Sequence, residues 1–156
     1  MKRLISILFP TILVIAMACA AGNNTAATTK GVLPMKFNIQ IDNGTSKHSL
    51  TATLNDNSSS RALVEFLEKG SITIDMHDYG NFEKVGSLPT SFPRNDTQIT
   101  TEPGDIILYQ GNQITFYYDT NSWNFTRLGK IDGATKDGLK KIFGKGKVTA
   151  ALSLRK

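Results

Sequence analysis

Alternation between apolar and polar residues predicts β-strands along much of the chain. Within Met35–Asp42 the apolar residues fall at every second position, a pattern typical of a strand buried on one face. Asn43-Gly44 then predicts a tight turn, and Ser49–Leu54 predicts a second strand. The chain therefore enters its folded part through a β-hairpin.

Two stretches place apolar residues at helical spacing instead. The first follows a capping loop at Asn55–Ser58 and stops at Gly70, and the second is capped by Thr135 and ends at Gly144. The inward-facing residues predicted for these helices are Ala62, Leu63, Phe66 and Leu67 in the first, and Leu139, Ile142 and Phe143 in the second.

The remaining apolar patterns predict further short strands. They lie at Ile72–Met76, Asp105–Tyr109, Gln113–Asp119, Trp123–Ile131 and Val148–Leu154, with the second and third forming a hairpin. His77–Ser91 is rich in turn residues and is predicted to be a long irregular excursion, the kind of segment that often carries function.

This order of elements predicts a mainly β fold. Six to eight short strands, with one helix after the first hairpin and another before the last strand, favour a closed or nearly closed antiparallel barrel whose two open ends are capped by the helices. Closure of the barrel would also remove the exposed sheet edges that invite aggregation.

The first residues have the pattern of an export signal. Met1-Lys2-Arg3 is basic, Leu4–Ile15 is apolar, and Ala16-Met17-Ala18 supplies small residues before a cleavage point. An uncleaved membrane anchor is the alternative, but the apolar part is shorter than the roughly 20 residues of a spanning helix. We predict a signal peptide at 1–18, a flexible tether at 19–32 and one globular domain at 33–156.

Cys19 is the only cysteine in the chain and follows Ala18 directly. Ala16-Met17-Ala18-Cys19 resembles the lipobox of bacterial lipoproteins, although Ala16 stands where leucine is usual. A conventional cut, for example after Ala18-Cys19-Ala20, stays open. We therefore expect an exported protein, either a cell-envelope lipoprotein held to the membrane by lipid on Cys19 or a freely secreted or periplasmic form.

Charge along the 156 residues is uneven, although the net charge is +5. Residues 127–156 hold nine basic and two acidic side chains, whereas 19–126 hold seven basic and eleven acidic ones. The basic end could face anionic lipid or polymer. We favour the simpler interpretation that these basic residues form a solvated helix face and tail. No nucleic-acid partner is expected, because the lysines lack aromatic neighbours that could stack on bases.

Several short motifs follow one another in a recognisable order over about residues 36–154. They are Thr51–Asn57, Phe82-Glu83-Lys84, Leu88-Pro89-Thr90, Pro103–Tyr109, Phe116-Tyr117-Tyr118 and Phe125–Ile131. In this order they resemble the bacterial cyclophilin-like family, small prokaryotic relatives of the cyclophilins. The resemblance implies a closed cyclophilin-like antiparallel β-barrel.

True cyclophilins isomerise X-Pro bonds with an arginine that polarises the amide, in a Phe-His-Arg segment followed by Phe and Gln-Gly-Gly-Asp. The corresponding segment here, Met76–Lys84, has the acid Asp78 at the expected arginine and no Gln-Gly-Gly. Arg94 or Arg127 could substitute only if the fold aimed it into the cleft. We therefore expect no efficient isomerase activity.

The sequence thus predicts a binding cleft that holds a peptide segment or small ligand. A secreted peptidyl-prolyl isomerase and a structural or partner-docking module are the alternatives. Burial in the barrel core is favoured for Phe116 and Phe125, whereas Tyr79 and Trp123 are the better ligand contacts. His48 and His77 lack the spacing of a metal site, so neither metal nor cofactor is expected. The ligand-binding candidates are Tyr79, Phe82, Glu83, Arg94, Phe116, Tyr118, Trp123 and Arg127.

Overall fold

The structure is a computed structural model that describes residues 35–155. The predicted signal peptide at 1–18, the tether at 19–32 and the lipidation site at Cys19 lie outside the described residues. Within them, no helix is long and apolar enough to cross a membrane.

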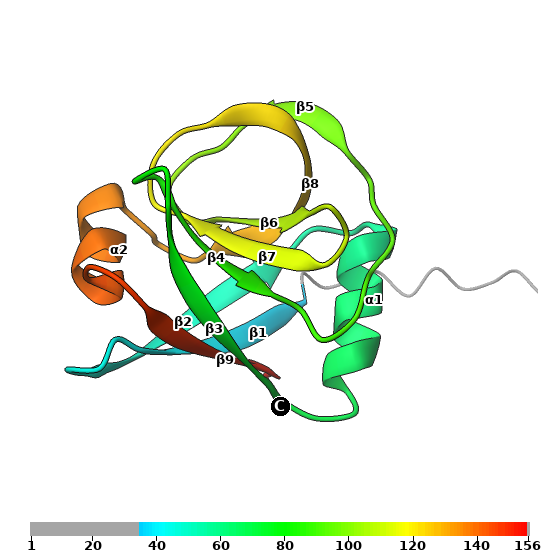
Figure 1. The fold of residues 1–156 in the computed structure, drawn as a ribbon. Helices are drawn as coiled ribbons and strands as arrows, with labels where there is room; N and C mark the ends of the chain where they lie inside the picture. Colours follow the sequence, from blue (N-terminus) through cyan, green and yellow to red (C-terminus); the bar gives the residue numbers. More distant parts are fainter. Residues whose placement is uncertain (1–34, 156) are drawn as a thin grey trace, which may run out of the picture. The chain divides into compact units, whose positions relative to one another are not determined.

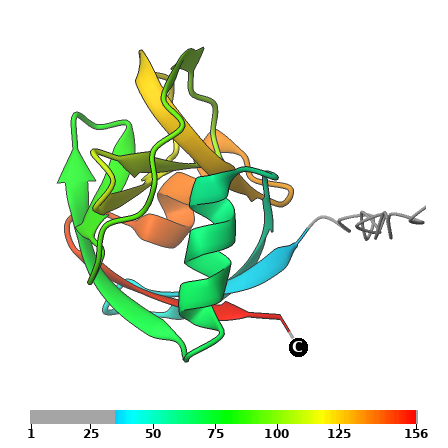
Figure 2. The ribbon, with the colours of Figure 1, turned by 90° about the vertical axis from the view of Figure 1, so that its right-hand side faces the viewer.

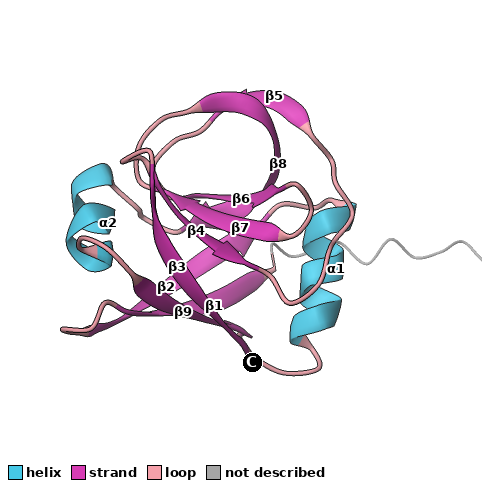
Figure 3. Ribbon diagram, viewed as in Figure 1, coloured by secondary structure: helices cyan, strands magenta, loops and turns pink. Residues whose placement is uncertain are grey.

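Strands dominate the described part of the chain (Figures 1 and 3). The order is β1 (Lys36–Asp42), β2 (Lys47–Leu54), α1 (Ser58–Leu67), β3 (Ile72–Tyr79), β4 (Glu83–Ser87), β5 (Thr97–Thr100), β6 (Asp105–Tyr109), β7 (Gln113–Tyr117), β8 (Ser122–Ile131), α2 (Lys136–Phe143) and β9 (Val148–Leu154). The predicted barrel with two helices is confirmed.

The sheet closes on itself through a short seam between β2 and β8. Neighbouring strands run in the order β2-β1-β9-β3-β4-β7-β6-β8, all antiparallel, and the seam pairs Ala52, Thr53 and Leu54 with residues of β8. Opposite Leu54 stands Gly129, where a Cβ would lie 2.3 Å from the carbonyl oxygen of Thr53. A glycine is therefore needed for the strands to approach closely enough to close the barrel.

The two helices lie at opposite ends of the barrel (Figures 1 and 2). Asn57 caps α1 and Thr135 caps α2, each through a side-chain oxygen that accepts from a backbone N–H in the first turn. Each helix buries an apolar face on the core through Leu63 and Leu67 in α1 and Phe143 in α2. The predicted capping residues and helix faces are confirmed.

A second, smaller apolar cluster lies on the outer face of the sheet. It is formed by Ile107, Tyr117 and Phe125, with Phe82 and Tyr109 packed against it. A β-bulge in the pairing of β6 with β8, between Ile106 and Ile107, bends the sheet next to this cluster. The first half of β8, paired with β5, forms an arch beside this cluster (Figure 1).

The prediction of an irregular excursion at His77–Ser91 was wrong. β3 continues to Tyr79, and β4 pairs with it through a turn at Gly80-Asn81, where both residues have positive φ. The sequence pattern predicted no strand at β5, a peripheral strand of four residues with Ile99 as its only apolar side chain.

Candidate functional site

A pocket of about 420 Å³ lies on the outer face of the sheet and is lined in part by Trp123 and Phe125 of β8. Side chains of five strands reach it, because β3, β4, β7, β6 and β8 are neighbours in that order and every second residue faces outward. The lining residues are His77, Tyr79, Glu83, Val85, Gly86, Ser87, Tyr109, Gln113, Tyr117, Asn121, Trp123 and Phe125.

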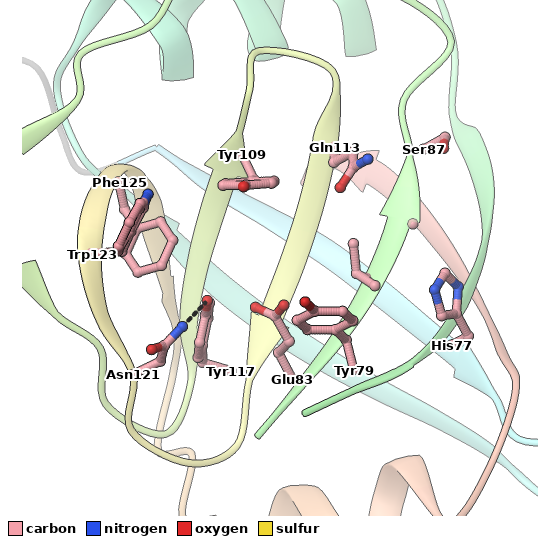
Figure 4. A pocket seen from close by; sticks show the side chains of 12 residues that line it. His77, Tyr79, Glu83, Ser87, Tyr109, Gln113, Tyr117, Asn121, Trp123 and Phe125 are labelled. Atoms are coloured by element: carbon pink, nitrogen blue, oxygen red, sulfur yellow. Dashed lines mark hydrogen bonds between the residues drawn. The ribbon is translucent and has the colours of Figure 1, made fainter. Parts of the chain in front are cut away.

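Aromatic rings form both the floor and the rim of this pocket (Figure 4). Tyr117 and Phe125 belong to the outer apolar cluster and are 1% and 4% exposed. Tyr79 and Trp123 are each 61% exposed and are the large hydrophobic residues most open to solvent among those described. Exposed rings beside a pocket are typical of a ligand contact surface.

Glu83 places a carboxylate in this aromatic surrounding, between the rings of Tyr117 and Tyr79 (Figure 4). The residue is only 7% exposed, and its Oε2 atom has no hydrogen-bond partner within residues 35–155. Burial raises the pKa of Glu83, although the hydroxyls of Tyr117 and Thr115 offset part of the change. Burial and the neighbouring Glu83 likewise raise the pKa of Tyr117.

We expect Glu83→Gln to stabilise the fold at neutral pH, because the substitution removes a buried charge while it keeps the shape of the side chain and an acceptor. A raised pKa means that the protonated acid favours folding. That contribution is complete below the ordinary pKa of 4.5 and is lost as the pH rises through the raised value. The stability gap between the two proteins should therefore widen over this range in urea unfolding at several pH values.

Glu65→Gln is the matched control, since Glu65 is an exposed glutamate on α1. This variant should follow the wild-type pH dependence. A Glu83→Gln protein no more stable than wild type at neutral pH would show that the buried carboxylate carries no cost.

Phe82 and Phe116 do not line the pocket. Phe82 supports it from one side, because its ring is stacked on Tyr117 at 5.9 Å and meets Tyr79 edge-on at 6.1 Å. Phe116 is fully buried on the opposite face of β7, where it packs against Phe143 of α2. The structure therefore places Phe116 in the barrel core, the interpretation that the sequence favoured. The same interpretation was wrong for Phe125, which lies in the outer apolar cluster and lines the pocket.

Tyr118 also lies away from the pocket, in a network under α2. Its hydroxyl donates to Asp78 Oδ1 at 3.1 Å, and its ring lies below Lys140. The fully buried Lys84 reaches the same carboxylate at 2.8 Å and donates to the carbonyl of Gly146 at 2.7 Å. Burial and the bond to Asp78 raise the pKa of Tyr118 to about 12.

Neither arginine reaches the pocket. Arg94 is paired with Asp96, and Arg127 is paired with the buried Asp105 at 2.8 Å. The lining residues of the pocket include no lysine and no arginine. A pocket of this composition has no fixed cation that could polarise a bound amide in the way that the cyclophilin arginine is expected to act.

His77 and Glu83 line the pocket together, whereas the intervening Asp78 points to the other face of β3. The three side chains His77, Asp78 and Glu83 therefore do not converge on one site. Among residues 35–155 no group of three or more His, Cys, Asp or Glu side chains is placed to hold a metal ion.

Sequence reasoning missed several pocket residues. Tyr109, Gln113 and Asn121 were not among its candidates, and Tyr117 was left out in favour of its neighbours. One available signal was Gly80-Asn81, a dipeptide that favours the tight turn of a hairpin. A hairpin at this turn places Tyr79 and Glu83 opposite each other on one face of the sheet, and the structure pairs these two residues.

Comparison with known proteins agrees with this architecture. The solution structure of a hypothetical protein from Archaeoglobus fulgidus is similar to the chain, with a TM-score of 0.55 and 14% identity, over 81% of this chain and 99% of the archaeal one. This likeness concerns the fold alone. No curated protein matches the sequence. The family model described as the cyclophilin-like family matches residues 39–153, so the chain belongs to the cyclophilin-like family.

Proposed function

We propose that the protein is a binding protein that holds a peptide segment or a small ligand in the pocket beside Glu83, without efficient catalysis. The pocket itself is the observation that carries this proposal. Its volume of about 420 Å³ lies within the range of ligand sites, and its rings surround a few polar groups, as such sites usually do.

Prolyl isomerase activity is the second candidate, supported by the family alone. The pocket argues against it, because Arg94 and Arg127 are engaged elsewhere by Asp96 and Asp105. A purely structural or partner-docking module is less well supported than a binding protein, since such a module needs no ligand-sized pocket.

A fragment and peptide screen read by tryptophan fluorescence tests the proposal. Trp123 is the only tryptophan in the chain and lines the pocket, so its emission reports on this site alone. We expect hits whose affinity falls about tenfold or more in Tyr79→Ala, because the loss of a large aromatic contact costs more than 1 kcal/mol at many binding sites.

The control is Gln98→Ala, an exposed residue of β5 that does not line the pocket, and it should bind as wild type does. Hits that bind Tyr79→Ala equally well would contradict this site. Turnover of a proline peptide that disappears in Arg94→Ala or Arg127→Ala would replace the binding role with an isomerase.

Export and anchoring belong to the same proposal. The apolar, basic-led segment at 1–18 and the single cysteine at its end support a lipoprotein that is held to the cell-envelope membrane. Metabolic labelling with a palmitate analogue should tag the wild-type protein and not Cys19→Ala. An untagged, freely soluble wild-type product would favour the secreted or periplasmic form.

A further inference from the structure

We propose that the pocket selects ligands that carry an organic cation, such as a primary ammonium group on an apolar body, and that Glu83 is the residue that binds the cation. This inference rests on the proposed function, since it names the class of ligand for the same pocket. Three features of the described residues lead to it.

The first feature is an acceptor without a donor. Glu83 is more than nine-tenths buried and lines the pocket, and its Oε2 atom makes no hydrogen bond among the described residues, although the nearby hydroxyls of Tyr117 and Thr115 offset part of the rise in its pKa. A buried acceptor of this kind costs free energy until a donor reaches it, and a charged donor gives the stronger hydrogen bond. A bound ammonium would also offset the burial that disfavours the ionised form of Glu83.

The second feature is the absence of lysine and arginine from the residues that line the pocket. Lys84 adjoins Glu83 in β4, but its side chain points to the opposite face and is neutralised by Asp78. No lysine or arginine lines the pocket. An anionic ligand would therefore meet the Glu83 carboxylate with no fixed positive charge to compensate, which disfavours that class.

The third feature is the aromatic surrounding. The rings of Tyr79 and Tyr117 flank the Glu83 carboxylate, and Trp123 lies across the pocket (Figure 4). The faces of such rings attract organic cations, tryptophan most strongly. The same rings also offer apolar surface for the body of the ligand. A carboxylate among aromatic rings thus suits a cation with an apolar body better than a neutral or anionic one.

A charge series with a constant ring tests this inference. Phenethylamine, phenethyl alcohol and hydrocinnamate share a phenyl body and differ in carrying a positive, a neutral and a negative group. Trp123 fluorescence, excited at the red edge of tryptophan absorption, gives the affinity of each. We expect the wild-type protein to prefer the amine to the alcohol by about tenfold, with hydrocinnamate weakest, because a hydrogen bond between two charged groups is stronger than one from a neutral hydroxyl.

Glu83→Gln should remove this preference while the alcohol still binds, because glutamine keeps the shape and an acceptor but not the charge. The variant is expected to be folded, since the substitution relieves a buried charge. Glu65→Gln, on the exposed face of α1, should keep the full preference.

Equal wild-type affinity for amine and alcohol, or a preference that survives in Glu83→Gln, would overturn the inference and leave the proposed function standing. Hits from the fragment screen that bind the pocket while the amine does not would have the same effect. Failure of every fragment, peptide and probe to bind the pocket would remove the proposed function as well.

Discussion

Phe116→Ala is expected to lower the free energy of unfolding by about 3–5 kcal/mol, the usual cost of emptying a large aromatic site in a core. Phe116 is fully buried in the barrel, and its ring packs on Phe143 of α2 with centroids 6.2 Å apart. The substitution removes contacts with both the sheet and the helix that covers one end of the barrel. Urea unfolding monitored by circular dichroism measures the effect.

Ligand binding separates this core role from a role in the pocket. Phe116→Leu keeps most of the buried volume, should remain folded, and should bind the fragment hits as wild type does. Tyr117→Phe, the neighbouring position on the opposite face, changes the pocket instead and should alter binding with little loss of stability. A Phe116→Leu protein whose ligand affinity falls as far as that of Tyr79→Ala would contradict the assignment of the two faces.

Lys84→Met is expected to cost about 3 kcal/mol, the lower end of the range for breaking a buried ion pair, because the side chain of Asp78 keeps 31% exposure. Methionine fills the space of the lysine stem but leaves Asp78 without its cation. It also leaves the carbonyl oxygens of Gly144 and Gly146 without their donor. Chemical unfolding gives the cost, and amide hydrogen exchange at Gly146 should show that the segment after α2 is loosened.

Lys136→Met provides the comparison. Lys136 is paired with Asp119 on the surface with 48% of its side chain exposed, so its loss should cost at most about 1 kcal/mol. An equal loss of unfolding free energy in the two variants would mean that the buried network stabilises the fold no more than a surface ion pair does. In the double variant Lys84→Met/Asp78→Asn, the cost should be smaller than the sum of the two single changes, because the second change removes the charge that the first leaves unpaired.

The same network gives a pH dependence in the acid range. Partial burial alone would raise the pKa of Asp78, but hydrogen bonds from Lys84, Gly146 and Tyr118 outweigh it and lower the pKa below 3.8. The stability that this carboxylate contributes is therefore present above 3.8 and is lost as the pH falls through the lowered value. The direction is opposite to that of Glu83 on the neighbouring strand.

The strands and helices with one buried face could be predicted from sequence. The alternation in β1 and β9 and the capping residues of both helices indicated elements that the structure has at the same places. β4 could not be recognised in this way, because it is buried on both faces and carries Glu83 on one and Lys84 on the other. Two adjacent charged residues usually indicate a solvent-exposed loop. Their burial in a strand can be recognised only when the residues that neutralise or surround them are known.

The candidate site was predicted only in part for a related reason. Three consecutive aromatic residues, Phe116, Tyr117 and Tyr118, allow the alternation of β7 to be assigned either way. Period two pairs Phe116 with Tyr118, and the structure directs that pair to the core and the network under α2, with Tyr117 in the pocket. Both faces of the strand are covered, so burial preference could not decide between them.

The position of β9 between β1 and β3 has a consequence for the order of events during synthesis. β1 and β3 do not pair with each other in the sheet and are joined through Val148–Leu154, the last strand described. Before this strand has been synthesised, β1 and β3 each have an unpaired edge. Such edges are prone to pair with other chains. The barrel can therefore close only after Val148–Leu154 has been made, and we expect a chain arrested before Val148 to be prone to aggregation.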